Sequence, residues 1–189
     1  LKLHKKAFSL RTAVFHRRAT DLIDWVKQHP ADKWETRNIT KLQTSGAEAA
    51  GLWQPGGAVL QSLGLSYTYM TQAKDGAGLI SHYAFDYLRH KLTARTSLQL
   101  WGRLALHTTA TWQDRLGEFV RYDAESGQST LHPYSSVWLW DARLAWEGRR
   151  VTVYADATNL LGTEYHDLGS TPMPGRWLKA GARFRLNFN

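Results

Sequence analysis

The sequence contains no cysteine among its 189 residues. Disulfide bonds, thiol catalysis and cysteine-ligated metal sites are therefore excluded. Long apolar runs are also missing, because the longest uncharged stretch, residues 49–73, is interrupted by Pro55-Gly56-Gly57 and by several Ser, Thr and Gln residues. A membrane-spanning helix needs about 20 consecutive, mainly apolar residues, so the sequence excludes a helical membrane protein.

Catalytic and metal-binding patterns are missing as well. The eight His residues are scattered without the spacing of metal ligands, and no glycine-rich phosphate loop or paired acid/base motif is present. Tyr165-His166-Asp167 has suitable side chains for a metal, but adjacent residues point in different directions, which favours a polar loop or strand end. We therefore expect no enzyme activity, no catalytic or metal-ligating residues and no cofactor.

Positive charge exceeds negative charge, and the formal net charge is +8 at pH 7. Lys and Arg residues are spread along the sequence and do not form blocks, which argues against nucleic acid as a partner. A phosphate-rich membrane surface is compatible with this distribution.

Aromatic residues are abundant, with nine Trp and eight Tyr. Their rings combine a large apolar body with a polar tip, so they concentrate where an apolar phase meets water. Apolar and polar residues also alternate with the period of a β-strand. Within residues 59–73, small polar residues occupy one face, and the other face carries Leu63, Leu65, Tyr67 and Tyr69.

The alternation predicts about eight β-strands, several of them much longer than the usual five or six residues. Their predicted bounds are 5–18, 35–53, 59–73, 83–100, 103–120, 135–146, 150–158 and 176–188. Short links fall at 54–58, 101–102 and 147–149, and long polar links fall at 19–34, 74–82, 121–134 and 159–175. In an up-and-down meander, all short turns then lie at one end, as in outer-membrane barrels.

Aromatic residues mark both ends of the predicted strands. Trp53, Trp101 and Trp146 lie beside the short turns. Near the other end lie Tyr67, Tyr69, Tyr87, Trp112, Trp138, Trp140 and Trp177. Two such girdles predict an all-β, antiparallel, up-and-down transmembrane β-barrel with its apolar face toward lipid and its polar face toward the lumen.

The closing stretch has a distinctive order of residues. Asn159-Leu160-Leu161 precedes Tyr165, Asp167 and Gly169, and Pro172-Met173-Pro174-Gly175-Arg176-Trp177 then opens the last alternating segment. This order resembles the C-terminal end of a TonB-dependent outer-membrane receptor of the cobalamin, siderophore or haem type. Strand motifs such as Leu65-Ser66-Tyr67-Thr68-Tyr69 extend the likeness over essentially the whole chain.

The resemblance implies a barrel of about 22 strands with a plugged lumen. It also implies TonB-dependent uptake of a scarce, bulky nutrient such as cobalamin, a ferric siderophore or haem, across the outer membrane of a Gram-negative bacterium. About eight strands are too few for that barrel. We therefore expect residues 1–189 to form its C-terminal portion, without the plug domain, the earlier strands and the N-terminal region through which the TonB complex would bind.

Ligand selection in such a receptor would come from the long links. Aromatic and His side chains there suit a planar chelate, and the candidates are Trp25, His29, Trp34, His82, Tyr83, Tyr122 and His132. Because the plug is absent, we expect little high-affinity binding by this portion alone. The expected membrane partners are outer-membrane lipid and lipopolysaccharide. Cations near the long links are candidates for binding the phosphates of these lipids: Lys27, Lys33, Lys74 and Arg121.

Three alternatives remain open at this point. The chain could be a complete small eight-stranded barrel with a structural or adhesion role, which the strand number permits. An outer-membrane lipase or protease is a second alternative, although no Ser-His-Asp or paired-Asp motif is present. A soluble β-domain would instead gather Leu104, Leu178 and Phe184 in a dry centre, with its arginines at the periphery.

Overall fold

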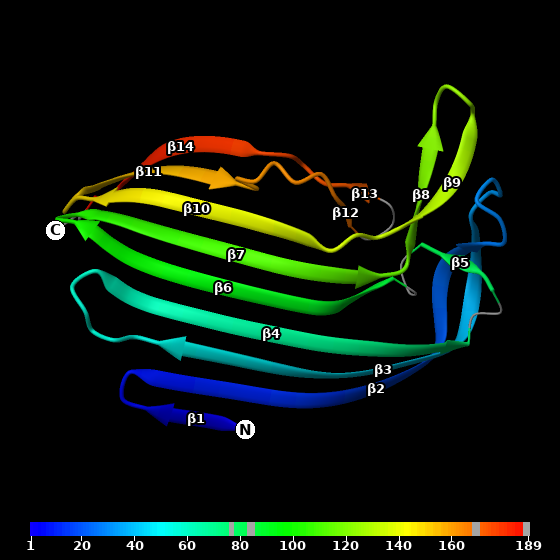
Figure 1. Cartoon of the computed structure of the whole chain (residues 1–189), viewed down its shortest axis with the longest axis horizontal. Coiled ribbons are helices and arrows are strands. Elements are labelled where there is room, and N and C mark those ends of the chain that lie inside the picture. Colours follow the sequence, from blue (N-terminus) through cyan, green and yellow to red (C-terminus); the bar gives the residue numbers. More distant parts are fainter. Residues whose placement is uncertain (76–77, 83–85, 168–170, 187–189) are drawn as a thin grey trace.

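The computed structural model describes residues 1–75, 78–82, 86–167 and 171–186, and its regular structure is made of β-strands (Figure 1). The eight long strands are β2 (Phe8–Lys27), β3 (Glu35–Trp53), β4 (Leu60–Asp75), β6 (Tyr87–Trp101), β7 (Leu104–Leu116), β10 (Val137–Glu147), β11 (Val151–Thr158) and β14 (Trp177–Phe184). The short strands are β1 (Lys2–Lys5), β5 (Ile80–Ser81), β8 (Glu118–Asp123), β9 (Gln128–Pro133), β12 (His166–Asp167) and β13 (Thr171–Pro172). Over the described residues, no helix is both long enough and apolar enough to cross a membrane.

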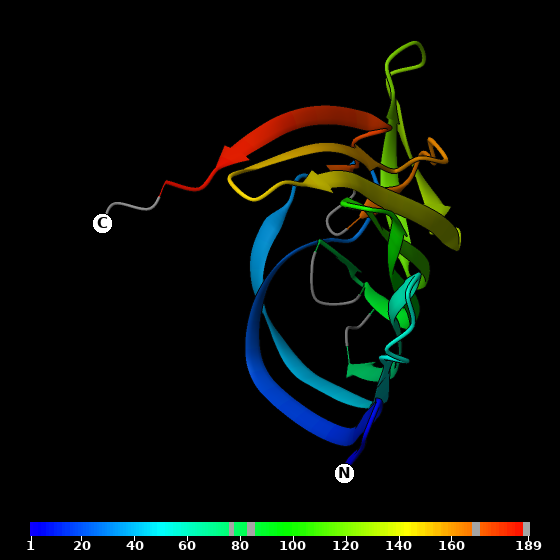
Figure 2. The same cartoon turned by 90° about the vertical axis from the view of Figure 1, so that its left-hand side faces the viewer.

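The long strands form one antiparallel sheet that follows the order of the chain. Its order is β1-β2-β3-β4-β6-β7-β10-β11-β14, and β5 also pairs with β2. Figure 2 shows that the sheet bends into an arc. Within the described residues, β1 and β14 are the two edges of this order and do not pair with each other. The sheet is therefore an open part of a barrel wall and does not form a closed eight-stranded barrel.

The two ends of the sheet differ as predicted. Residues 54–59, 102–103 and 148–150 make the short turns at one end, and the longer connections lie at the other end (Figure 1). We call the second end the loop end. At the turn end, Gly102 has a φ of +54°, a conformation that favours glycine in the two-residue turn between β6 and β7.

Several strand bounds differ from the predicted ones. β2 continues to Lys27, well past the predicted end at residue 18, because its far half still pairs with β3, as in Thr20 with Lys41. The predicted link 121–134 is largely the hairpin of β8 and β9. β7 ends before Gly117, whose φ of +126° interrupts the strand. The predicted start of β6 at 83–85 and the end of the chain at 187–189 lie outside the described residues.

One face of the sheet is apolar and exposed. Directly paired residues share a face, and the register aligns Leu65 with Ala94, Ala94 with Ala110, and Ala110 with Trp140. On the same face, Val14 is 87% exposed and Leu178 is 75% exposed. These apolar side chains therefore do not gather in a dry centre.

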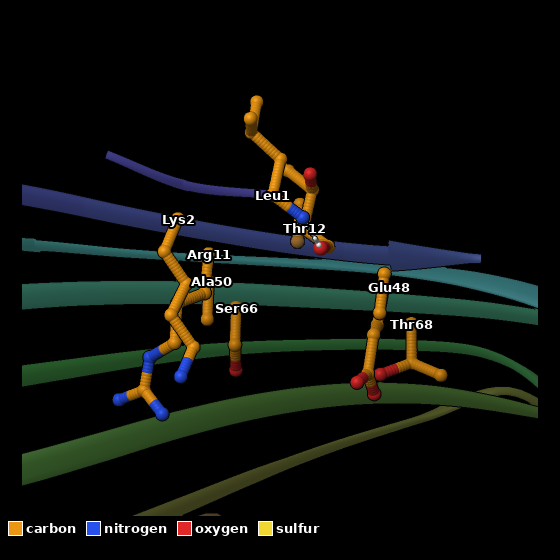
Figure 3. Close-up of a pocket in the computed structure, with 10 residues that line it drawn as sticks. Leu1, Lys2, Arg11, Thr12, Glu48, Ala50, Ser66 and Thr68 are labelled. Atoms are coloured by element: carbon orange, nitrogen blue, oxygen red, sulfur yellow. Dashed lines mark hydrogen bonds between the residues drawn. The ribbon is translucent and has the colours of Figure 1, made fainter.

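The other face is polar and lies on the inside of the arc. It carries the covered strand residues Thr44, Thr93, Gln113 and Asp156, together with two small ones, Ala105 and Ala145. Figure 3 shows four of its side chains pointing to the same side of β2, β3 and β4: Arg11, Glu48, Ser66 and Thr68. The predicted arrangement, with an apolar outer face and a polar inner face, is confirmed.

The aromatic girdles form mostly as predicted. At the turn end, Trp53 and Trp146 lie on the outer face, and Trp101 pairs with Leu104 on that face. The outer face at the loop end carries Tyr67, Tyr69, Trp112, Trp138 and Trp140. Two residues depart from the prediction. Tyr87 is only 7% exposed, and Trp177 is opposite Thr158, one residue from Ala157 and therefore on the inner face.

A pair of arginine substitutions on β7 tests which face meets lipid. Leu106→Arg places a charge on the outer face, where arginine costs about 2–4 kcal/mol near the middle of a bilayer. Thr109→Arg places the same charge on the inner face, opposite Asp141. In the intact receptor folded into lipid vesicles, urea unfolding should show destabilisation by Leu106→Arg and little change by Thr109→Arg. The reverse order would contradict the assignment of the faces.

Candidate binding site at the loop end

The far part of β2 forms a covered cluster with β5, which we call the β2-tip cluster (Asp24, Val26, Lys27, Trp34, Ser81 and His82). β5 pairs with β2 through Val26 opposite Ser81. The Ser81 hydroxyl donates a hydrogen bond to the Asp24 carboxylate, and the His82 amide donates to the Trp25 carbonyl over 2.8 Å. Val26 is fully buried. The connection between β4 and β6 is thus anchored to β2.

Two side chains of this cluster hold the link between β2 and β3. The Lys27 ammonium donates to the Pro30 carbonyl and lies 4.6 Å from the centroid of the Trp34 ring. The Trp34 ring in turn lies 4.6 Å from the His82 ring. Burial lowers the pKa of Lys27, although Asp32 opposes the shift, and burial also lowers the pKa of His82. A neutral imidazole is therefore favoured beside the lysine at neutral pH.

A second group of side chains joins three connections at the loop end, and we call it the mouth network (Asp86, Arg115, Gly117, Tyr134 and Asp167). The Tyr134 hydroxyl donates to Asp86 over 3.0 Å, and the Arg115 guanidinium pairs with Asp167. Arg115 also lies 5.6 Å from the centroid of the Tyr134 ring. A side chain at Gly117 would meet the Asp86 carboxylate at 2.2 Å, so only glycine leaves room for that carboxylate.

The Asp86 carboxyl is the titratable group of this network. Its burial raises the pKa to about 6. The hydrogen bond from Tyr134 and the positive charges of Lys74 and Arg115 act in the opposite direction. The carboxyl therefore changes its charge near pH 6, well above the ordinary value for Asp.

Aromatic and imidazole rings gather beside the mouth network. The His166 ring stacks on Phe119 with 4.1 Å between centroids, and His132 lies 5.7 Å from Phe119. A small pocket of about 110 Å³ opens here, and Tyr165 lines it together with His166. Asp167 points instead to Arg115. The triplet 165–167 therefore does not converge on one point, and the described residues include no group of three or more ligands suited to a metal ion.

A larger cleft of about 910 Å³ lies between the two groups, and we call it the mouth cleft. Its described lining combines positive and negative side chains with apolar ones: His29, Lys74, Leu79, Ser81, Asp86, Glu118 and Leu131. Such a lining can hold a polar ligand by hydrogen bonds and ionic contacts.

The predicted ligand-binding residues that the structure describes divide among three places. Trp25, Trp34 and His82 belong to or adjoin the β2-tip cluster, and His29 lines the mouth cleft. Tyr122 and His132 lie on the β8–β9 hairpin, where Tyr122 is 65% exposed. Tyr83 lies outside the described residues. The exposed rings of Trp25 and Tyr122 are available to a ligand, whereas the Trp34 ring already contacts Lys27 and His82.

Sequence reasoning missed the carboxylates Asp24 and Asp86 of these two groups. Asp24, Asp86 and Arg115 are brought together with their partners by pairing between segments that are distant in the chain. Only Gly117 offered a signal, because a glycine directly after an alternating run suggests an interruption of the strand.

A family model described as TonB dependent receptor-like, beta-barrel matches residues 1–160 of the sequence. No curated protein matches the sequence significantly.

Solved structures share the fold. The FrpB iron transporter from Neisseria meningitidis superposes with a TM-score of 0.67 and 11% identity, over 97% of this chain and 29% of that one. The ferripyoverdine receptor of the outer membrane of Pseudomonas aeruginosa has a TM-score of 0.66 and 17% identity, over 94% and 25%. The copper transporter OprC has a TM-score of 0.69 and 11% identity, over 97% and 29%. The chain thus spans less than a third of the length of each of these structures.

The mouth network should titrate near pH 6. A raised pKa means that the folded loops bind the Asp86 proton more tightly than unfolded ones, so this contribution to stability is present below about pH 4 and is lost as pH rises through about 6. Tyr134→Phe removes a donor that favours the carboxylate, and should move the midpoint to higher pH. Backbone hydrogen exchange of residues 117–134, followed as a function of pH and corrected for intrinsic rates, measures this midpoint.

The matched control for this titration is Tyr122→Phe, which removes a hydroxyl from the same hairpin without touching Asp86. It should leave the midpoint unchanged. A midpoint that falls in Tyr134→Phe, or that moves equally in both variants, would contradict the assigned role of Tyr134.

Proposed function

The chain belongs to the TonB-dependent receptor-like β-barrel family, and from this premise we propose that it forms part of the wall of a receptor for active nutrient uptake. The family consists of outer-membrane proteins of Gram-negative bacteria, and this chain is located in that membrane. The observation that carries the proposal is the sheet with an apolar outer face, a polar inner face and long connections at one end only.

The proposed protein is longer than this chain. Residues 1–189 would be the C-terminal portion of its barrel domain, and other parts of the protein would supply the earlier strands, the plug domain and the contact with the TonB complex. The polar inner face supports this arrangement, because no second layer of described residues covers it and it presents Arg11, Glu48, Arg95 and Lys179 to whatever occupies the lumen.

The proposed substrate is a scarce, bulky metal chelate. The structures that share the fold are described as an iron transporter, a receptor bound to ferripyoverdine and a copper transporter, which favours a ferric siderophore or another metal complex. Cobalamin and haem belong to the same class of substrate. The role is transport without catalysis, and an adhesion role for a small complete barrel is less well supported because the sheet is open.

The ligand would enter at the loop end. Trp25 and Tyr122 offer exposed aromatic rings that can stack on a planar or aromatic chelate. His29 and the charged groups of the mouth cleft supply polar contacts beside them. Because this portion provides only one side of the mouth, tight binding requires the intact receptor.

Deleting the gene of the intact receptor should abolish TonB-dependent growth on one nutrient source. The panel to be compared consists of ferric siderophores, haem, cobalamin and copper under limitation. Normal growth on all of them would contradict the proposed transport, as would a further loss of growth when the gene is deleted in a strain that already lacks TonB.

Truncating the exposed rings should weaken binding of that nutrient. The double variant Trp25→Ala/Tyr122→Ala is expected to raise Kd about tenfold, equivalent to about 1.4 kcal/mol, because it removes stacking area. Titration of the purified intact receptor measures Kd. Trp25→Phe/Tyr122→Phe keeps an aromatic ring at both positions and should remain within about threefold of the wild type. An unchanged Kd in the alanine variant would exclude these rings from the binding site.

A further inference from the structure

The outer face of β2, β3 and β4 changes from apolar to polar just beyond the girdle at the loop end. Val14, Ala47 and Tyr69 are aligned across the three strands at the level of the girdle. Two residues further along each strand, the same face carries His16, Ser45 and Thr71. Arg18 opposite Gln43, and Thr20 opposite Lys41, follow on this face.

These side chains form the outer cationic patch, defined as His16, Arg18, Lys41, Gln43, Ser45 and Thr71. Arg18 and Lys41 are both exposed, and neither takes part in an ion pair between described residues. In the register Lys41 lies opposite Asp75, whereas Arg18 lies opposite Gln43. Between β6 and β7, by contrast, Arg89 is paired with Asp114 at 2.7 Å.

The patch also presents neutral hydrogen-bonding groups. The His16 ring nitrogen lies 2.9 Å from the Ser45 hydroxyl, which holds the imidazole beside Arg18. Gln43 and Thr71 add an amide and a hydroxyl on the same face. A guanidinium binds phosphate with two parallel hydrogen bonds, and an ammonium binds it as a point charge. Hydroxyl and amide groups suit the hydroxyls of a sugar.

The position of the patch selects the partner. It lies on the lipid-facing side, directly outside the aromatic girdle, where the headgroups of the outer leaflet are found. A plug domain would face the opposite side of the sheet. We propose that the outer cationic patch binds the phosphate groups of a phosphorylated glycolipid, the class to which lipopolysaccharide belongs; this rests on the placement of the wall in the outer membrane that the proposed function uses.

Three of the four cations predicted from the sequence for this role lie elsewhere. Lys27 is buried in the β2-tip cluster, and Lys74 lies opposite Leu42 on the inner face. Arg121 belongs to the β8–β9 hairpin, which projects from the sheet (Figure 1). Arg18 and Lys41 replace them because the continuation of β2 and β3 beyond the girdle, which the sequence did not predict for β2, brings these two side chains to one face.

Adjacent arginines on β2 provide the test. Arg18→Gln/Lys41→Gln removes the positive charge of the patch, whereas Arg17→Gln removes one charge from the inner face at the same height. The intact receptor is purified from outer membranes, and the bound glycolipid is quantified by native mass spectrometry. The double variant should retain at least fivefold less glycolipid, Arg17→Gln should retain the wild-type amount, and Arg18→Lys should retain most of it.

The binding probe is hexa-acylated lipid A with two phosphates, compared with the same lipid after removal of its phosphates. The diphosphorylated form should bind the wild type at least fivefold more tightly, and millimolar inorganic phosphate should not displace it. Equal binding of both lipids, displacement by inorganic phosphate, or equal loss in Arg17→Gln and the double variant would overturn the proposal. Heat-modifiable mobility on gels confirms that each variant is folded, and intact chelate uptake in the double variant separates this proposal from the transport function.

Discussion

The structure depends on one constraint, which is that a chain surrounded by hydrocarbon must satisfy its backbone hydrogen bonds internally. The long strands meet it by pairing with both neighbours in one continuous ladder from β2 to β11. Once the ladder is fixed, side chains alternate strictly between lipid and lumen. The apolar outer face, the polar inner face and the position of each girdle all follow from that alternation. A conventional core is not required. Val26 is the one large side chain that is fully buried among the described residues, and it lies near the end of β2, beyond the girdle at the loop end.

The same alternation explains what the sequence predicts well. Leu63 to Tyr69 and Leu104 to Trp112 carry a signal that is repeated residue by residue, so strand type, face and turn end could be read directly. The family match covers residues 1–160 and therefore rests on these strands more than on the closing motif at 159–177. Where the signal weakens, the bounds fail: residues 19–27 and 118–133 do not alternate regularly between apolar and polar residues, yet both segments form strands because a partner strand is available.

The loop end could not be predicted to the same depth, because its contacts join segments that are distant in the chain. Asp24 meets Ser81, Asp86 meets Tyr134, and Arg115 meets Asp167. No periodic pattern specifies such pairs. Aromatic and His residues were selected by their position in the long links and by their chemistry, and the structure separates them into exposed rings, such as Trp25, and rings such as Trp34 that hold the loops. Chemistry suggests which residues can bind a ligand, and only tertiary contacts decide which remain available.

The inner face shows how a polar wall acquires order without a core. Arg143 forms two hydrogen bonds of 2.5 and 2.8 Å with Asp156, Lys179 lies 3.7 Å from the same carboxylate, and the three residues come from β10, β11 and β14. The Tyr154 ring lies against Gly181, where a side chain would meet it at 2.6 Å, and Arg143 stacks on the ring at 4.7 Å. Glycine thus makes space for an aromatic ring that in turn orients the guanidinium. A lumen-filling domain would meet charges that are already fixed in place, so less conformational freedom would be lost on docking.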